Sequence, residues 1–190
     1  VQRVEREIVQ HVLGWRYLLR TFIHGKEELS EDMIKTTHSI VMHGISPAER
    51  SGETSSENGE GGTWEVHAGQ YRSAEASSSS SSSSTHSPSP SPPSIIQRKM
   101  QELVTDFNTR ISSSSLKESI DPVELAAEFS YRILRIQPFL YGNGRVARLF
   151  VNTILLHFLG VIAPFGQSSE ERALYVGLMA KERLSQLKVG

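Results

Sequence analysis

The chain has 190 residues, which is long enough for one domain with a hydrophobic core. Its 20 basic and 21 acidic residues give a formal net charge of −1, so no basic excess indicates binding to nucleic acid or to an anionic membrane surface. The absence of cysteine excludes disulfides and thiolate metal sites, and predicts an intracellular, cytoplasmic location. No apolar run approaches the roughly 20 residues of a membrane span, while the start at Val1 leaves an upstream targeting or anchoring segment open.

Residues 4–22 carry apolar side chains at helical spacing, which predicts an amphipathic helix. We expect the face formed by these side chains to pack into the core: Val4, Ile8, Val12, Trp15, Leu19 and Phe22. The pair His24-Gly25 follows and is expected to end the helix.

Ser30 predicts the start of a second helix, since it is a good N-cap and acidic residues follow it in the first turn. Apolar residues then recur at helical spacing as far as Val41, and Gly44 ends the pattern. His38 and His43 lie five residues apart, so they do not share a helix face and a common metal ion is not expected.

Two stretches, 51–62 and 77–94, form a low-complexity insertion within a single domain of residues 1–190. The first is rich in Gly, Ser and Glu, and the second contains the serine run 77–84 followed by repeated proline. Neither composition supports a packed core. Between the two stretches, residues 63–67 alternate enough to predict a short strand.

The second half of the chain predicts further helices, which makes the fold class all-α. A capping box at residues 94–97 begins a helix whose apolar face runs to Ile111. Asp121 is a strong cap for the next helix, which has proline at its first position and continues to Ile136. Residues 143–159 are apolar nearly all round, as expected of a buried central helix.

The loop that leads into this last helix combines glycines with arginines. Gly142 and Gly144 allow backbone N–H groups to approach a ligand closely, and the first N–H groups of a helix have no partner within it. Arg145 and Arg148 lie three residues apart on one face of the first turn. Together with the helix dipole, these groups predict an anion site suited to phosphate.

The string from Gln137 to Arg148 resembles the signature of the Fic (Fido) family, His-Pro-Phe-x-[Asp/Glu]-Gly-Asn-Gly-Arg-x-x-Arg. The resemblance extends over about residues 30–180 and implies one Fic-fold helical bundle with a small β-hairpin flap. Most members of that family transfer AMP from ATP to a protein hydroxyl. The resemblance implies that ATP phosphates bind at Gly142, Asn143, Gly144, Arg145 and Arg148.

Two positions depart from the signature. Gln137 stands where the family has its catalytic His, and an amide cannot take up a proton near neutral pH. Tyr141 stands where the family has the acidic ligand of Mg²⁺, and a phenol stays protonated at neutral pH. We therefore expect ATP to bind and catalysis to be weakened or lost. Binding of Mg²⁺ is doubtful, because Tyr141 replaces its acidic protein ligand.

The string Gly69-Gln70-Tyr71-Arg72 resembles the Gly-x-[Tyr/Phe]-Arg that opens the flap in Fic proteins. That flap is thought to hold a target segment as an added strand. Here the serine run 77–84 interrupts it. The flap near residues 63–76 is therefore either degraded and disordered, or split by a flexible insertion.

Residues 168–171 predict the start of a last helix through another capping box. Tyr175 follows on that helix, and the resemblance implies that it is a weak candidate for the border of an adenine pocket. Residues 56–61 match the string of the family's inhibitory helix, [Ser/Thr]-x-x-x-Glu-[Gly/Asn], but we interpret the match as chance because the surrounding residues lack helical patterning.

Three functions remain open from the sequence. The leading hypothesis is a Fido-domain, ATP-binding protein of the AMP-transferase family with weakened or lost catalysis and an unknown protein target. The second is an active protein adenylyltransferase with an unusual base. The third is a ligand-free interaction scaffold whose Ser/Pro segment is a phosphorylated docking site.

Overall fold

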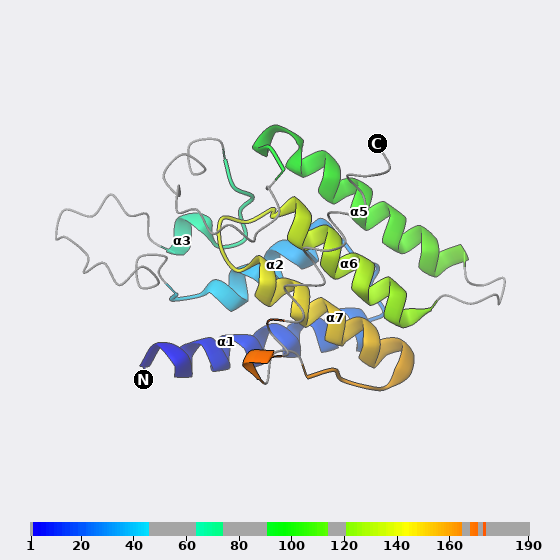
Figure 1. The fold of residues 1–190 in the computed structure, drawn as a ribbon, viewed down its shortest axis with the longest axis horizontal. Helices are drawn as coiled ribbons and strands as arrows, with labels where there is room; N and C mark the ends of the chain where they lie inside the picture. The colour runs from blue at the N-terminus through cyan, green and yellow to red at the C-terminus, as the bar shows by residue number, and fades with distance from the viewer. Residues whose placement is uncertain are drawn as a thin grey trace.

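The computed structural model describes residues 2–45, 64–73, 91–113, 121–164, 168–170 and 173. Its elements follow in the order α1 Gln2–Leu18, η1 Leu19–His24, α2 Glu31–Met42, α3 Trp64–His67, α5 Pro93–Ser113, α6 Pro122–Ile136 and α7 Asn143–Leu159. In Figure 1, α5, α6 and α7 follow one another across the molecule, and α1 lies along the edge opposite α5. The described residues contain helices and no strand, so the predicted all-α class is confirmed.

Helix α7 is central because it packs against α1, α2 and α6. Side chains on most faces of α7 are buried, as its composition predicts. The buried residues of α7 are Val146, Ala147, Leu149, Phe150, Val151, Thr153, Ile154 and Leu155. Aromatic rings extend this core across α6 into α5, with ring centroids 5.1 Å apart for Phe150 and Phe129 and 5.6 Å apart for Phe129 and Phe107.

The helix caps predicted at Ser30 and Asp121 are present. The Ser30 hydroxyl accepts a hydrogen bond from the Met33 amide at 3.1 Å, and Asp121 Oδ1 accepts one from the Val123 amide at 2.8 Å. Helix α5, however, begins at Pro93, so Ser94 lies in its first turn rather than at the cap. Proline is favoured at the first helical position because its fixed φ suits the first turn and its missing N–H costs nothing there.

The predicted packing face of the first helix is wrong in its first half, whereas towards its end Trp15 packs against the core and Phe22 is buried as predicted. Val4, Ile8 and Val12 are each 58–60% exposed, and the face that meets α2 and α7 instead contains Gly14 and Leu18. The reason is steric. A Cβ placed at Gly14 would lie 2.8 Å from a Val41 methyl carbon and 3.1 Å from a Leu149 methyl carbon, so α1 approaches its neighbours closely only along this glycine. None of the described helices is long and apolar enough to cross a membrane.

The strand predicted at residues 63–67 is also wrong for the part that the structure describes, because Trp64–His67 form the helical turn α3. Gly69 follows with φ 72°, and the chain then runs without regular structure to Ser73. A stretch this short has no strand partner among the described residues, and without one its alternation does not define a strand. We call residues 69–72 the strap, since they lie across α2 and the start of the site.

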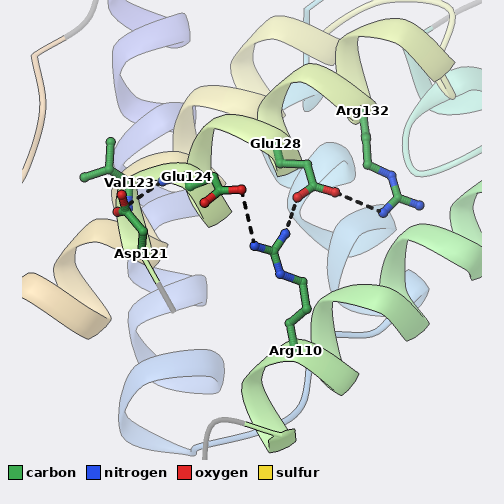
Figure 2. Close-up of polar contacts among 6 residues, drawn as sticks. All are labelled: Arg110, Asp121, Val123, Glu124, Glu128 and Arg132. Atoms are coloured by element: carbon green, nitrogen blue, oxygen red, sulfur yellow. Dashed lines mark hydrogen bonds and ion pairs between the residues drawn. The ribbon is translucent and has the colours of Figure 1, made fainter. Parts of the chain in front are cut away.

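Ion pairs fasten α5 to α6 along their exposed edge (Figure 2). The Arg110 guanidinium reaches from α5 to Glu128 and, at 3.9 Å, to Glu124. Arg132 of α6 in turn lies 2.8 Å from Asp106 and 3.7 Å from Glu128. Because most of these groups are partly exposed, we expect the pairs to orient the two helices more than to stabilise them.

The cap at the start of α6 gives a first prediction. Asp121→Ala removes the acceptor that satisfies two amides of the first turn, so the free energy of unfolding should fall by about 1 kcal/mol. Asp121→Asn keeps an oxygen in the same place and should cost much less. Urea unfolding of the three proteins measures both effects, and an alanine variant as stable as the unaltered chain would contradict this role.

Candidate functional site

The candidate site is the turn between α6 and α7. Helix α6 ends at Ile136, and Gln137 caps it in the left-handed conformation, with φ 47° and ψ 62°. The Gln137 amide still donates to the Ile133 carbonyl at 2.9 Å, so the chain reverses without losing that bond. A left-handed conformation is uncommon for a residue other than glycine, and the surrounding contacts must hold it in place.

The side chain of Asn143 closes this turn from within. Its Oδ1 accepts the Phe139 amide at 3.0 Å, and its Nδ2 donates to the Phe139 carbonyl at 2.7 Å. Phe139 is itself buried, so both polar groups of its backbone are satisfied by one amide side chain. The resemblance implies that Asn143 binds phosphate, but in this conformation its side chain is committed to the loop.

The first residues of α7 leave amide groups available. The Arg145 and Val146 amides both donate to the Gly142 carbonyl, at 3.0 and 3.1 Å, whereas the Asn143 and Gly144 amides donate to no group within the described part of the chain. Gly142 must be glycine, because its φ is 78° and a Cβ there would lie 2.8 Å from Met42 Sδ. Two unpaired N–H groups at the positive end of a helix dipole form an arrangement that binds anions.

The two arginines of the turn have different surroundings. Arg145 Nη2 lies 2.8 Å from Glu7 Oε1, its Nη1 donates to the Val41 carbonyl at 3.3 Å, and its side chain is only 17% exposed. Arg148 is exposed, and its Nη1 would lie 3.4 Å from a Cβ placed at Gly144. Arg148 therefore stands beside the unpaired amides, while Arg145 ties α7 to α1 and α2.

His38 of α2 contacts the turn between α6 and α7 and joins it to the strap. Its Nδ1 accepts the Gly69 amide at 2.9 Å, so Nε2 carries the proton and donates to the Tyr141 carbonyl at 3.0 Å. The imidazole stacks on the Phe139 ring, with centroids 3.7 Å apart and planes 4° apart. Burial, with a smaller effect of the nearby Arg145 cation, lowers the pKa of His38 to about 4, so the ring is neutral at neutral pH.

The strap fixes the other side of the turn through Arg72. Its amide donates to the Pro138 carbonyl at 2.9 Å, and its Nε donates to the Gln137 carbonyl at 2.7 Å. Its Nη2 donates to the Ser91 carbonyl and, at 3.5 Å, to the Ile136 carbonyl. The guanidinium thus satisfies carbonyls at the end of α6, where the helix dipole also favours a cation.

Tyr71 holds the strap onto α2. Its hydroxyl donates to Glu31 Oε2 at 2.8 Å, the Lys35 ammonium lies 4.5 Å from its ring centroid, and its ring lies 5.5 Å from that of Phe139. Burial, followed by the hydrogen bond to Glu31, raises the pKa of Tyr71 well above its ordinary value, so it acts only as a donor. Gly69 completes the contact, since a Cβ there would lie 3.1 Å from the Lys35 carbonyl oxygen.

The structure brings together the predicted residues of the turn and the strap, and it adds one that sequence reasoning missed. This residue is Glu7, which pairs with Arg145. It lies on a helix whose predicted packing face consists of other residues, and no local sequence pattern marks it as functional. A charged residue on the inner side of α1 becomes noticeable only once Gly14 is known to mark that side. Tyr175 and the 56–61 string lie outside the described residues.

The side chains near the turn do not resemble a metal site. Among the described residues, no three His, Asp or Glu side chains are grouped so that they could hold a metal ion. Tyr141, at the signature position of the acidic ligand, is half-buried and packs against the core. A phenol at that place offers no carboxylate, and Mg²⁺ prefers carboxylate and water oxygens.

Comparison with known proteins identifies the family. A model of the Fic/DOC family matches residues 28–155. The chain belongs to this family. The match includes the helix that carries His38, the strap and the whole α6–α7 turn.

Relatives and solved structures agree with this membership. The chain is 28% identical over 189 residues to protein adenylyltransferase fic-1 of Caenorhabditis elegans and 30% identical over 157 residues to protein adenylyltransferase Fic of Nematostella vectensis. These alignments cover 98% and 80% of the chain but only 30% of each relative. The chain therefore spans about 30% of the length of these curated relatives.

Solved structures share its fold. A Fic-domain-containing signaling protein from Bacteroides thetaiotaomicron aligns with a TM-score of 0.68 at 23% identity, over 94% of this chain and 57% of that one. A segment of Fic-1 from Caenorhabditis elegans aligns with the same TM-score at 25% identity, over 97% of this chain and 46% of that one. The helical bundle described above is therefore the Fic fold.

The neutral state of His38 predicts sensitivity to acid. Its pKa is about 4 in the folded chain against an ordinary 6.5, so the unfolded chain binds more protons between these values and stability falls as the pH drops through them. By about pH 4.5 this group alone should cost on the order of 2–3 kcal/mol. Urea unfolding at about pH 7 and about pH 4.5 measures the loss, which should be smaller in His38→Gln because glutamine gains no proton. Equal losses in the two proteins would refute the assignment.

Proposed function

We propose that this Fic domain binds ATP through its phosphates at the N-terminus of α7 and transfers AMP slowly or not at all. One observation carries the proposal: the unpaired amides of Asn143 and Gly144 lie beside the exposed guanidinium of Arg148. Unpaired helix amides and an arginine together recognise phosphate oxygens. The relatives named protein adenylyltransferases support the choice of ATP and of a protein as the second substrate.

In this proposal, Arg145 positions the phosphate site rather than binding phosphate itself. Its guanidinium is largely buried against Glu7 and the Val41 carbonyl, so it holds the first turn of α7 in place. The side chain of Asn143 likewise holds the turn in place through its two hydrogen bonds to Phe139, while the backbone N–H of Asn143 faces the anion site. The phosphate contacts then come from backbone amides and from Arg148.

Weak catalysis follows from the chemistry of Gln137. Attack of a protein hydroxyl on the α-phosphate requires a group that accepts the hydroxyl proton, and the glutamine amide does not do so near neutral pH. The absence of a general base typically lowers a rate by about 10²–10⁴. The backbone of Gln137 nevertheless has the left-handed conformation that His also tolerates, so the turn can accept the family residue.

Binding of ATP is tested by isothermal titration calorimetry on the unaltered chain and on Arg148→Ala. Loss of one charge-assisted contact should weaken binding by about 1.5–3 kcal/mol. Arg98→Ala is the matched control, because Arg98 is an exposed arginine on α5 that pairs with Glu102 of the same helix, and it should leave the affinity unchanged. Equal affinity in the unaltered chain and Arg148→Ala would remove Arg148 from the site.

Catalytic weakness is tested by transfer of labelled AMP from ATP onto the chain itself. We expect little transfer by the unaltered chain, a small gain from Gln137→His, and a larger gain when Tyr141→Asp returns the carboxylate of the signature as well. The combined gain should exceed the product of the single gains, because residues that act as one catalytic unit are not additive. Transfer by the unaltered chain as fast as by the double variant would show that catalysis is not weakened.

A further inference from the structure

Helices α1 and α7 run in the same direction where they touch, which fixes how their side chains pair (Figure 1). Glu7 meets Arg145 near the start of the contact, and further along both helices Gly14 meets Leu149. His11 follows Glu7 by one turn on the same face of α1, and Arg148 follows Arg145 by about one turn on α7. This register places His11 opposite Arg148.

The surroundings of His11 are cationic. Burial lowers its pKa most, and the charges of Arg148 and then Arg145 lower it further, so its imidazole is neutral at neutral pH. Arg145 also interacts with Glu7 on the same helix as His11, with which it pairs, and with His38 on α2, whose pKa it lowers. The α2 residues that contact α1 at Gly14 are aliphatic.

We propose that His11 is a further phosphate ligand of this Fic domain, and that it binds the terminal phosphates of ATP together with Arg148. The proposal rests on the ATP site proposed above and extends that site to α1. An imidazole and a guanidinium that face each other repel when both are charged, whereas a phosphate between them attracts both. Phosphate binding should therefore cause His11 to take up a proton and donate a charge-assisted hydrogen bond.

The test compares ATP binding at about pH 6 and about pH 8 for the unaltered chain, His11→Asn and His24→Asn, using calorimetry. His11→Asn should weaken ATP binding roughly tenfold or more at the lower pH, the effect of losing a hydrogen bond to a charged group, and less at the higher pH. His24 is an exposed histidine at the end of η1, roughly 20 Å further along the helix at 1.5 Å per residue, so His24→Asn should bind as the unaltered chain does.

A second measurement needs no variant at the site. In the unaltered chain, the His11 imidazole resonance should titrate at a higher pH when ATP is present than when it is absent. Equal affinities of His11→Asn and the unaltered chain at both pH values, or an imidazole titration that ATP does not move, would overturn the role of His11. Either result would leave the ATP site intact if Arg148→Ala still weakens binding, whereas an unaltered chain that binds no ATP would overturn the proposed function itself.

Discussion

The site depends on how Asn143 closes the turn between α6 and α7. One side-chain amide satisfies both the N–H and the carbonyl of Phe139, a buried residue whose backbone would otherwise be unpaired in the core. Removal of this amide would leave two buried polar groups without partners, each at a cost of about 1–3 kcal/mol. The fixed Phe139 ring then provides the surface on which His38 stacks.

The other contacts around the turn follow from that constraint. His38 joins the turn to α2 and to the strap, Arg72 joins the strap to the last carbonyls of α6, and Glu7 joins α1 to Arg145. Residues that appear in the signature thus divide into two groups. Some hold the turn in shape, and what remains for a ligand is a pair of backbone amides with an exposed arginine beside them. In the function proposed above, the phosphate ligands are therefore separate from position 137, where Gln137 stands in place of the signature histidine.

Parts of this arrangement could be predicted from the sequence because they depend on local chemistry. The caps at Ser30 and Asp121 are formed within one turn of the helix, and the helix from Asn143 is apolar on nearly every side. The need for glycine at 142 likewise follows from the signature loop, whereas its left-handed conformation is seen only in the structure. Pairing between distant segments could not be predicted in the same way.

The face of α1 shows why. Val4, Ile8 and Val12 have the spacing of a core face, but the neighbouring helices approach along Gly14, which a count of apolar residues does not detect. Glu7 and His11 were missed for the same reason, since both are ordinary polar residues until α7 is placed beside them. The strand predicted at 63–67 failed because alternation over so few residues does not determine secondary structure without a partner.

The central claim is that ATP phosphates bind at the unpaired amides of α7, and the most direct test is a titration of the ¹⁵N-labelled chain with ATP followed by NMR. The account predicts that the amide resonances of Asn143 and Gly144 shift together with the Arg148 side chain and saturate with one binding constant. It also predicts that the amides of the α5–α6 edge around Arg110 remain unchanged. Saturable shifts confined to another part of the chain, or no shift at Asn143 and Gly144, would contradict it.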